Sequence, residues 1–186
     1  MDKVKSLQEA IDGLEDGMTI GIGGWGPRRK PMALVRQILR SQLKDLTIVS
    51  YGGADVGMLC AAERVAKLIF AFVSLDFIPL EPFFRQARQS GKLSVLELDE
   101  GMMLLGLRAA AWRIPFIPTA VGLGTDIIQK ASSIKTISSP YDDKEWVAMP
   151  ALELDAALIH VDHADARGVC QISGPDHYMD DWFARA

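Results

Sequence analysis

Short apolar runs alternate along this chain with stretches in which apolar residues recur every three or four positions. The apolar runs predict buried strands at residues 18–22, 46–51, 68–73 and 93–98. The amphipathic or apolar stretches predict helices at residues 4–14, after Pro31, at about 57–65, at 82–89 and at 102–112. Strands that alternate with helices indicate an α/β protein with a mainly parallel sheet and right-handed crossovers.

The pattern changes after residue 113. Prolines and glycines punctuate residues 114–125, which predicts a long ordered loop, and the polar residues 132–144 predict a surface hairpin or excursion. Further strands are expected at 146–149 and 156–161, a turn at Arg167-Gly168 and the start of a helix at 178–186. We expect one domain over residues 1–186. The apolar residues of the last helix indicate either that the domain is truncated at this end or that a partner covers the exposed face of the helix.

The chemistry centres on a glycine-rich stretch after the first strand, residues 21–26, which is followed by Arg28, Arg29, Lys30 and Pro31. The candidate ligand-binding turn consists of Gly23, Gly24, Trp25 and Gly26. Glycines let the backbone approach a ligand closely, and a helix start after three cations concentrates N–H groups and positive charge. This favours an anion or oxyanion site. The alternatives are a tight turn and solvated surface charges.

The same stretch matches the dinucleotide-binding pattern Gly-x-Gly-x-x-Gly. That pattern also requires an acidic residue at the end of the second strand. The predicted second strand ends instead in Ser50-Tyr51-Gly52-Gly53, and Asp45 lies before it, at the wrong end of the sheet. The sequence therefore disfavours a nicotinamide or flavin site.

Parallel α/β sheets bind ligands beyond the carboxyl ends of their strands. Gly23-Gly24, Gly52-Gly53 and Asp99-Glu100 all follow predicted strands, so they should gather on one rim. Glu100 is the candidate general base, with Asp99 raising its pKa by repulsion, and the glycine amides are candidate donors to an oxyanion. The alternative for Asp99 or Glu100 is a helix cap.

Composition excludes several other classes. A formal charge of −4 without a basic stripe argues against nucleic-acid binding. No signal peptide or membrane-spanning run is visible, and Cys60 and Cys170 suit a cytoplasmic protein with reduced thiols. There is no Gly-x-Ser-x-Gly elbow. We expect no metal site, since the spacing of His160, His163 and His177, with Asp162 or Asp165, is nonspecific.

Three ordered blocks resemble the α subunits of family I coenzyme A transferases. The first block is Asp16-Gly17, an apolar run, Gly23-Gly24-Trp25 and Pro31, although Gly21 interrupts the apolar triplet and Arg29 replaces a glycine. The second block spans residues 97–125, with Arg108-Ala109 and a closing Gly-x-Gly-Thr. The third block spans residues 154–168.

The resemblance implies a three-layer αβα fold like that of CoA transferases and ribose-phosphate isomerase. It also implies a β-subunit partner and an acyl-CoA thioester substrate, with no permanently bound cofactor. The family's nucleophilic Ser-Glu-Asn-Gly motif is missing here, as expected if it lies on the β subunit. Gly-Trp-Gly-x-Arg-Arg-Lys-Pro and Asp99-Glu100-Gly101 resemble the branch that hydrolyses cyclic CoA thioesters in steroid breakdown. The alternatives are a true CoA transferase and a non-catalytic binding or regulatory domain.

Overall fold

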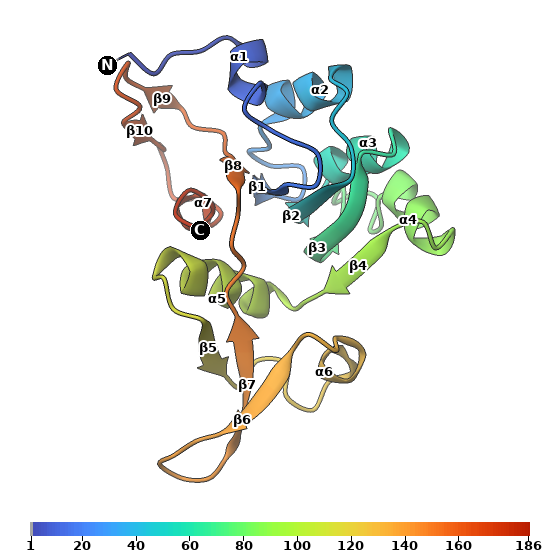
Figure 1. Cartoon of the computed structure of the whole chain (residues 1–186), viewed down its shortest axis with the longest axis vertical. Coiled ribbons are helices and arrows are strands. Elements are labelled where there is room, and N and C mark those ends of the chain that lie inside the picture. Colours follow the sequence, from blue (N-terminus) through green and yellow to red (C-terminus); the bar gives the residue numbers. More distant parts are fainter. Residues whose placement is uncertain (1) are drawn as a thin grey trace.

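Five parallel strands form the central sheet, in the order β4-β3-β2-β1-β8. The structure is a computed structural model that describes residues 2–186. The strands are β1 (Thr19–Trp25), β2 (Leu46–Gly52), β3 (Val65–Val73), β4 (Ser94–Glu97) and β8 (Ala156–Leu158). The chain runs outward from β1 to β4 and returns on the other side of β1 as β8 (Figure 1). Strand order therefore reverses at β1, where ligands of such sheets bind.

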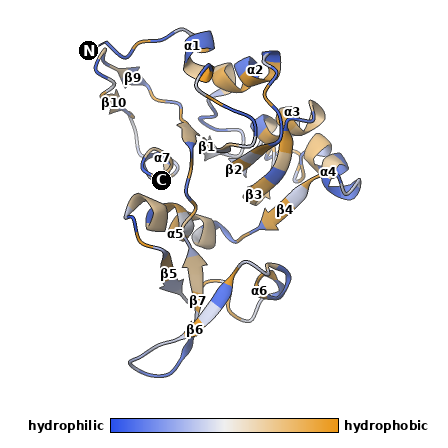
Figure 2. Ribbon diagram, in the orientation of Figure 1, coloured by the Kyte–Doolittle hydropathy of each residue, from blue (hydrophilic) through white to orange (hydrophobic). Residues whose placement is uncertain are grey.

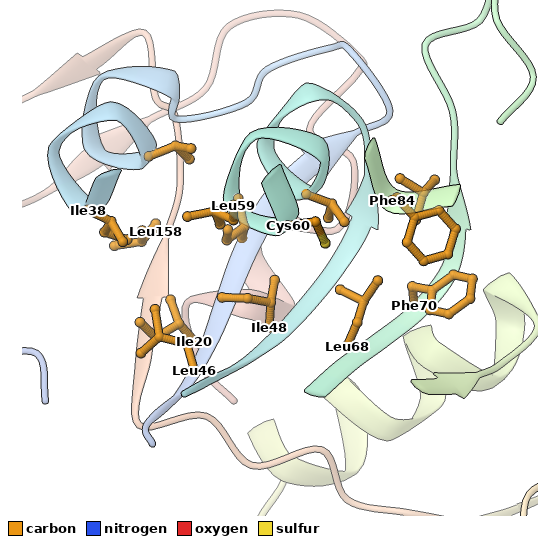
Figure 3. Close-up of a cluster of buried hydrophobic side chains, with 14 of the residues drawn as sticks. Ile20, Ile38, Leu46, Ile48, Leu59, Cys60, Leu68, Phe70, Phe84 and Leu158 are labelled. Atoms are coloured by element: carbon orange, nitrogen blue, oxygen red, sulfur yellow. The ribbon is translucent and has the colours of Figure 1, made fainter. Parts of the chain in front are cut away.

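Four helices cover one face of the sheet: α1 (Leu7–Ile11), α2 (Met32–Arg40), α3 (Ala54–Ala61) and α4 (Pro82–Gln89). Their apolar residues pack on alternate residues of the strands, such as Ile20, Ile48 and Leu68, in one buried cluster (Figure 3). Phe84 of α4 meets Phe70 of β3 edge to face, with ring centroids 5.1 Å apart. Burial of this apolar surface fixes the strand order and registers.

The other face of the sheet carries α5 (Glu100–Ala111), α7 (Asp180–Phe183) and a three-stranded antiparallel sheet of order β5-β7-β6. The small sheet consists of β5 (Phe116–Thr119), β6 (Lys135–Ser138) and β7 (Glu145–Pro150). Figure 1 shows it extending away from the parallel sheet, and Figure 2 shows that the loop joining β6 to β7 is largely hydrophilic. A second core cluster, including Val49, Tyr51 and Leu107, fills this side.

The α/β architecture and its parallel sheet are confirmed, as are the polar hairpin and the turn at Gly168, whose φ is 81°. Four elements were not predicted: strand β5, the short helix α6 (Asp126–Lys130), and the strands β9 (His163–Ala164) and β10 (Cys170–Gln171), which form a hairpin. The expectation of an irregular loop at 114–125 was wrong in part. Pro118 lies within β5, which a sheet tolerates because β5 is an edge strand.

Several boundaries also differ from the prediction. Helix α1 is shorter than residues 4–14, and α3 begins at Ala54, directly after Gly53, instead of near residue 57. The first strand continues through the glycine-rich stretch to Trp25 instead of ending at Ile22, with an irregularity between Ile22 and Trp25. Gly24 has a φ of 80°, a left-handed conformation that glycine adopts without penalty.

Candidate functional site

Aromatic side chains line the carboxyl edge of the sheet. Trp25 ends β1, and its ring stacks on that of Tyr51 near the end of β2, with centroids 5.3 Å apart. The ring centroid of Phe72 in β3 lies 5.1 Å from that of Trp25, and the ring centroid of Tyr178 lies 6.2 Å from it. Tyr51 is buried, while Trp25, Phe72 and Tyr178 are half-buried. We call these four residues the aromatic wall.

Glu100 lies beside this wall. It is the first residue of α5, it is exposed, and it has no ion-pair partner among residues 2–186. The Tyr51 hydroxyl donates a 2.9 Å hydrogen bond to the backbone oxygen of Glu100. Partial burial, and then the neighbouring charge of Asp99, raises the pKa of Glu100. A carboxylate of this kind is suited to proton transfer nearer neutral pH.

Asp99, the neighbouring carboxylate, has a structural role. It is the N-cap of α5, and its Oδ1 accepts a 2.7 Å hydrogen bond from the N–H of Gly101. The capping alternative therefore holds for Asp99, while the Glu100 side chain stays free. Burial, with the charges of Glu100 and Asp99, raises the pKa of Tyr51, so this residue acts only as a neutral hydrogen-bond donor.

The glycine amides come to the same rim, but most of them already have acceptors. The N–H of Gly24 donates to Asp180 Oδ1 at 2.6 Å, that of Gly26 to the Tyr51 oxygen at 3.0 Å, and that of Gly53 to Asp55 Oδ1 at 2.7 Å. The N–H of Trp25 donates to the Arg28 oxygen at 3.0 Å. In this conformation these four amides are not free donors for a substrate oxygen.

The two glycine turns touch each other. A methyl group added at Gly53 would collide with the backbone oxygen of Gly26, and one added at Gly52 would lie 2.8 Å from a methyl carbon of Val56. Glycine is needed here for close backbone packing between the ends of β1 and β2. The structure thus brings together the predicted Gly23–Gly26 and Gly52–Gly53 turns.

The basic run is paired within the chain. Lys30 is 8% exposed; its Nζ lies 2.8 Å from Ser50 Oγ and 3.1 Å from Asp55 Oδ2, and Ser50 donates to the same carboxylate at 2.8 Å. Burial lowers the pKa of Lys30, while Asp55 acts in the opposite direction. Lys30 is therefore inaccessible to a ligand, contrary to its predicted anion-binding role.

The two arginines also have carboxylate partners. Arg28 is half exposed and pairs with Asp76, after β3, at 2.6 Å. Arg29 donates to the backbone oxygen of His160 at 2.8 Å and lies 3.4 Å from Asp162. Its Nε also lies 3.9 Å from Oδ2 of the fully buried Asp180. Of the three cations, Arg28 is the one most open to solvent.

Sequence reasoning missed Asp55, Asp180 and most of the aromatic wall. Tyr51 carried a usable signal, because it ends an apolar strand just before Gly52-Gly53. No spacing rule connects Asp180 to Gly24, 156 positions earlier in the chain. The strand predicted at 156–161 is shorter in the structure: β8 ends at Leu158, so His160 follows it, and His163 begins β9.

Several observations bear on other kinds of site. Across residues 2–186, no group of three or more His, Cys, Asp or Glu residues is arranged to hold a metal ion. A cleft of about 590 Å³ lies at the amino ends of β2, β3 and β4, lined by Asp45, Glu63, Phe83, Lys92 and Cys60 among others. Burial raises the pKa of the Cys60 thiol to about 12, so this thiol is unreactive.

None of the helices in the described chain has the length and apolar character that crossing a membrane requires.

The fold and the rim define an α/β protein of the doubly wound type, with its candidate site at the carboxyl edge of a parallel sheet. Residues 4–186 match the sequence profile of the coenzyme A transferase family. The chain belongs to this family.

Two relatives in this family are about half identical to the chain. The chain is 50% identical to the cholesterol ring-cleaving hydrolase IpdA subunit of Rhodococcus jostii, over 100% of this chain and 65% of the relative. It is 48% identical to the IpdA subunit of Mycobacterium tuberculosis strain H37Rv, over 100% and 66% of the two lengths. The chain thus spans just under two thirds of these relatives.

Solved structures give the same fold. Glutaconate coenzyme A-transferase from Acidaminococcus fermentans superposes with a TM-score of 0.91 at 27% identity, covering 98% of this chain and 64% of that one. The decarboxylase AibA/AibB superposes with a TM-score of 0.87 at 28% identity, covering 98% and 71%. The predicted αβα fold of this family is confirmed.

Proposed function

We propose that this chain is the α subunit, or the greater part of one, of an enzyme that hydrolyses a carbon–carbon bond in a cyclic CoA thioester from steroid breakdown. The observation that carries the proposal is the Glu100 carboxylate, exposed and unpaired beside the aromatic wall, with a raised pKa. The identity of 50% to a ring-cleaving hydrolase subunit favours this chemistry within the family. The fold is also that of the decarboxylase AibA/AibB, and decarboxylation likewise breaks a carbon–carbon bond.

The reaction needs one group that accepts and then returns a proton. Glu100 takes a proton from a water molecule as the water oxygen attacks a ring ketone. The adjacent ring carbon–carbon bond breaks, and its electron pair moves onto the carbon next to the thioester carbonyl as an enolate. The Glu100 carboxyl then returns the proton to that carbon. One water molecule is consumed, a new carboxylate forms, and CoA stays attached.

The aromatic wall and Arg28 serve binding. Trp25 and Phe72 offer half-buried aromatic faces on which an apolar ring system can pack. Gly23 and Gly24 shape the rim instead: a side chain on Gly23 would collide with Asp180, and one on Gly24 with the backbone of Arg28 and Arg29. Arg28 is accessible for a CoA phosphate or substrate carboxylate, in exchange for its surface pair with Asp76. Because four rim amides are already occupied, we infer that a β-subunit partner supplies donors to the enolate oxygen.

An isotope experiment tests this function on the complex of the chain with its partner subunit. A cyclic β-keto acyl-CoA is incubated in H₂¹⁸O with acetate present, and the products are analysed by mass spectrometry. We expect one ¹⁸O atom in the new carboxylate and CoA still bound to the ring-opened acid. Transfer of CoA to acetate would refute the hydrolase.

A matched pair of variants then tests the role of Glu100. Glu100→Gln should lower kcat by about 10²–10⁴-fold, the usual contribution of a general acid–base group. Glu97→Gln serves as the control: this carboxylate ends β4, is half exposed and pairs with Arg88 at 2.6 Å. It should leave kcat within a factor of two. Full activity of Glu100→Gln would favour a non-catalytic role for this chain.

A true CoA transferase is the second candidate. It is favoured by the TM-score of 0.91 with glutaconate CoA-transferase and by the 29% identity of the chain to one subunit of that enzyme. In that case the nucleophilic glutamate lies on the partner, and the isotope experiment yields acetyl-CoA instead of a ring-opened acid.

A further inference from the structure

Asp180, like Asp55, is a fully buried acid that the proposed chemistry does not use. It is 0% exposed and is the first residue of α7, near the end of the chain. Its Oδ1 accepts the 2.6 Å hydrogen bond from the N–H of Gly24, in the middle of the candidate site. Burying a carboxylate this deeply costs free energy unless it is ion-paired and hydrogen-bonded.

The contacts of Asp180 hold the glycine stretch in a conformation that it would not keep alone. Gly24 is left-handed, and Arg29, five residues later, also has a positive φ of 54°. Arg29 Nε lies 3.9 Å from Asp180 Oδ2, and neither atom has a hydrogen-bond partner within the described chain. A side chain on Gly23 would collide with Asp180 Oδ1. The Asp180 carboxylate thus lies against Gly23, Gly24 and Arg29.

The segment around Asp180 also supports the aromatic wall. Tyr178 packs against Trp25, and Phe183 meets the Tyr51 ring edge to face at 6.3 Å. Tyr178 and Met179 have positive φ values of 44° and 61°, which non-glycine residues adopt only where surrounding contacts hold them. Trp25 is the residue after Gly24, so the peptide that Asp180 binds also sets the position of the Trp25 ring.

We propose that Asp180 is a positioning residue: its hydrogen bond to Gly24 fixes the Trp25 ring, and through Tyr51 the backbone of Glu100, for the reaction. The effect on turnover rests on the proposed function, whereas the effect on Trp25 does not. A peptide plane is rigid, so binding the Gly24 N–H also fixes the direction of the Gly23 carbonyl. Loss of this contact should misplace reacting groups by a fraction of an ångström to an ångström.

The test uses the complex of the chain and its partner subunit, labelled with 5-fluorotryptophan. The ¹⁹F resonance of Trp25 is assigned from Trp25→Phe. Asp180→Ala should shift or broaden that resonance and lower kcat on the order of 10²-fold, with a smaller change in KM. Asp180→Asn keeps an oxygen that accepts from Gly24, so it should restore the resonance and most of kcat. Asp176→Ala, an exposed acid in the same segment, is the control and should change neither.

The outcomes separate the two proposals. An unchanged Trp25 resonance in Asp180→Ala would overturn the positioning role, and so would equal losses in the Ala and Asn variants. A resonance that moves in Ala and returns in Asn, with turnover unaffected, would support positioning and refute catalysis at this rim. If Asp180→Ala does not fold, Gly23→Ala takes its place, because its methyl group displaces the same carboxylate. An unmoved Trp25 resonance in Gly23→Ala would also overturn the proposal.

Discussion

At the scale of single residues, two neighbouring carboxylates divide structural and chemical tasks. Asp99 turns back to cap α5 through Gly101, and Glu100, one position later, remains exposed beside Tyr51. The helix start imposes this division, since the N-cap side chain points to the free amides while the first helical residue points outward. The charge of Asp99 nevertheless acts on Glu100 and contributes to its raised pKa.

This coupling predicts the pH dependence of the reaction. A general base must be ionised, so kcat/KM should fall as the pH drops through the pKa of Glu100. Asp99→Asn keeps an oxygen that can cap Gly101 but removes a negative charge, which lowers the pKa of Glu100. The acidic limb of the pH–rate profile should therefore move to lower pH. The shift should be partial, because burial is the larger cause of the raised pKa. A limb that stays in place or moves to higher pH would contradict this assignment.

At the scale of elements, the basic run joins the glycine stretch to three other parts of the chain. Arg28 reaches Asp76 after β3, Arg29 reaches the segment between β8 and β9, and Lys30 reaches β2 and α3 through Ser50 and Asp55. Three consecutive cations at a helix start are unfavourable on their own. Here each has a carboxylate partner, so the run stabilises the shape of the site, and only the half-exposed Arg28 is open to a ligand anion.

The buried member of this run should matter most for stability. Lys30→Met leaves the fully buried Asp55 carboxylate without a cation, and we expect a loss of about 3–5 kcal/mol in the free energy of unfolding. Lys92→Met is the control, because its pair with Glu63 is about three-quarters exposed on both sides. It should cost less than about 1 kcal/mol. Chemical denaturation of both variants provides the measurement.

A double variant distinguishes the ion pair from a general loss of packing. Lys30→Met combined with Asp55→Asn should lose less stability than the sum of the single variants, because the uncompensated charge is gone. Additive losses would show that the pair does not govern the stability of this segment.

The same elements show what sequence patterns can predict. Apolar runs indicated the strands of the parallel half, because both faces of the central strands are buried, and helical periodicity indicated the helices, which bury one side. These patterns missed β5, since Pro115 and Pro118 hide a strand whose partner β7 is about 30 residues away. The rim glycines and Glu100 were predictable from the ends of strands. The partners of the basic run were not, because pairs such as Arg29 with Asp162 depend on tertiary packing alone.

At the scale of the whole molecule, the two ends of the sheet are unlike. The carboxyl end carries the aromatic wall, Glu100 and the glycine turns, and it lies where strand order reverses at β1. The amino end carries the cleft of about 590 Å³. A hollow of that size would accept a small ligand. It lacks the features of the rim, however, since its cysteine is a neutral thiol and its Lys92 pairs with Glu63 in solvent.

Hydrogen exchange on the complex can decide which end binds the thioester. Adding a CoA thioester should slow exchange in peptides that contain residues 23–26, 97–103 and 119–125, because Val121 lies near Gly101 at the start of α5. Peptides that line the amino-end cleft, such as those around Glu63 and Lys92, should be unaffected. The amides of β2 should exchange slowest with or without ligand, because this buried strand is bonded on both sides. Protection at the cleft without protection at the rim would place the substrate at the opposite end of the sheet, and Glu100 could then take no part in the reaction.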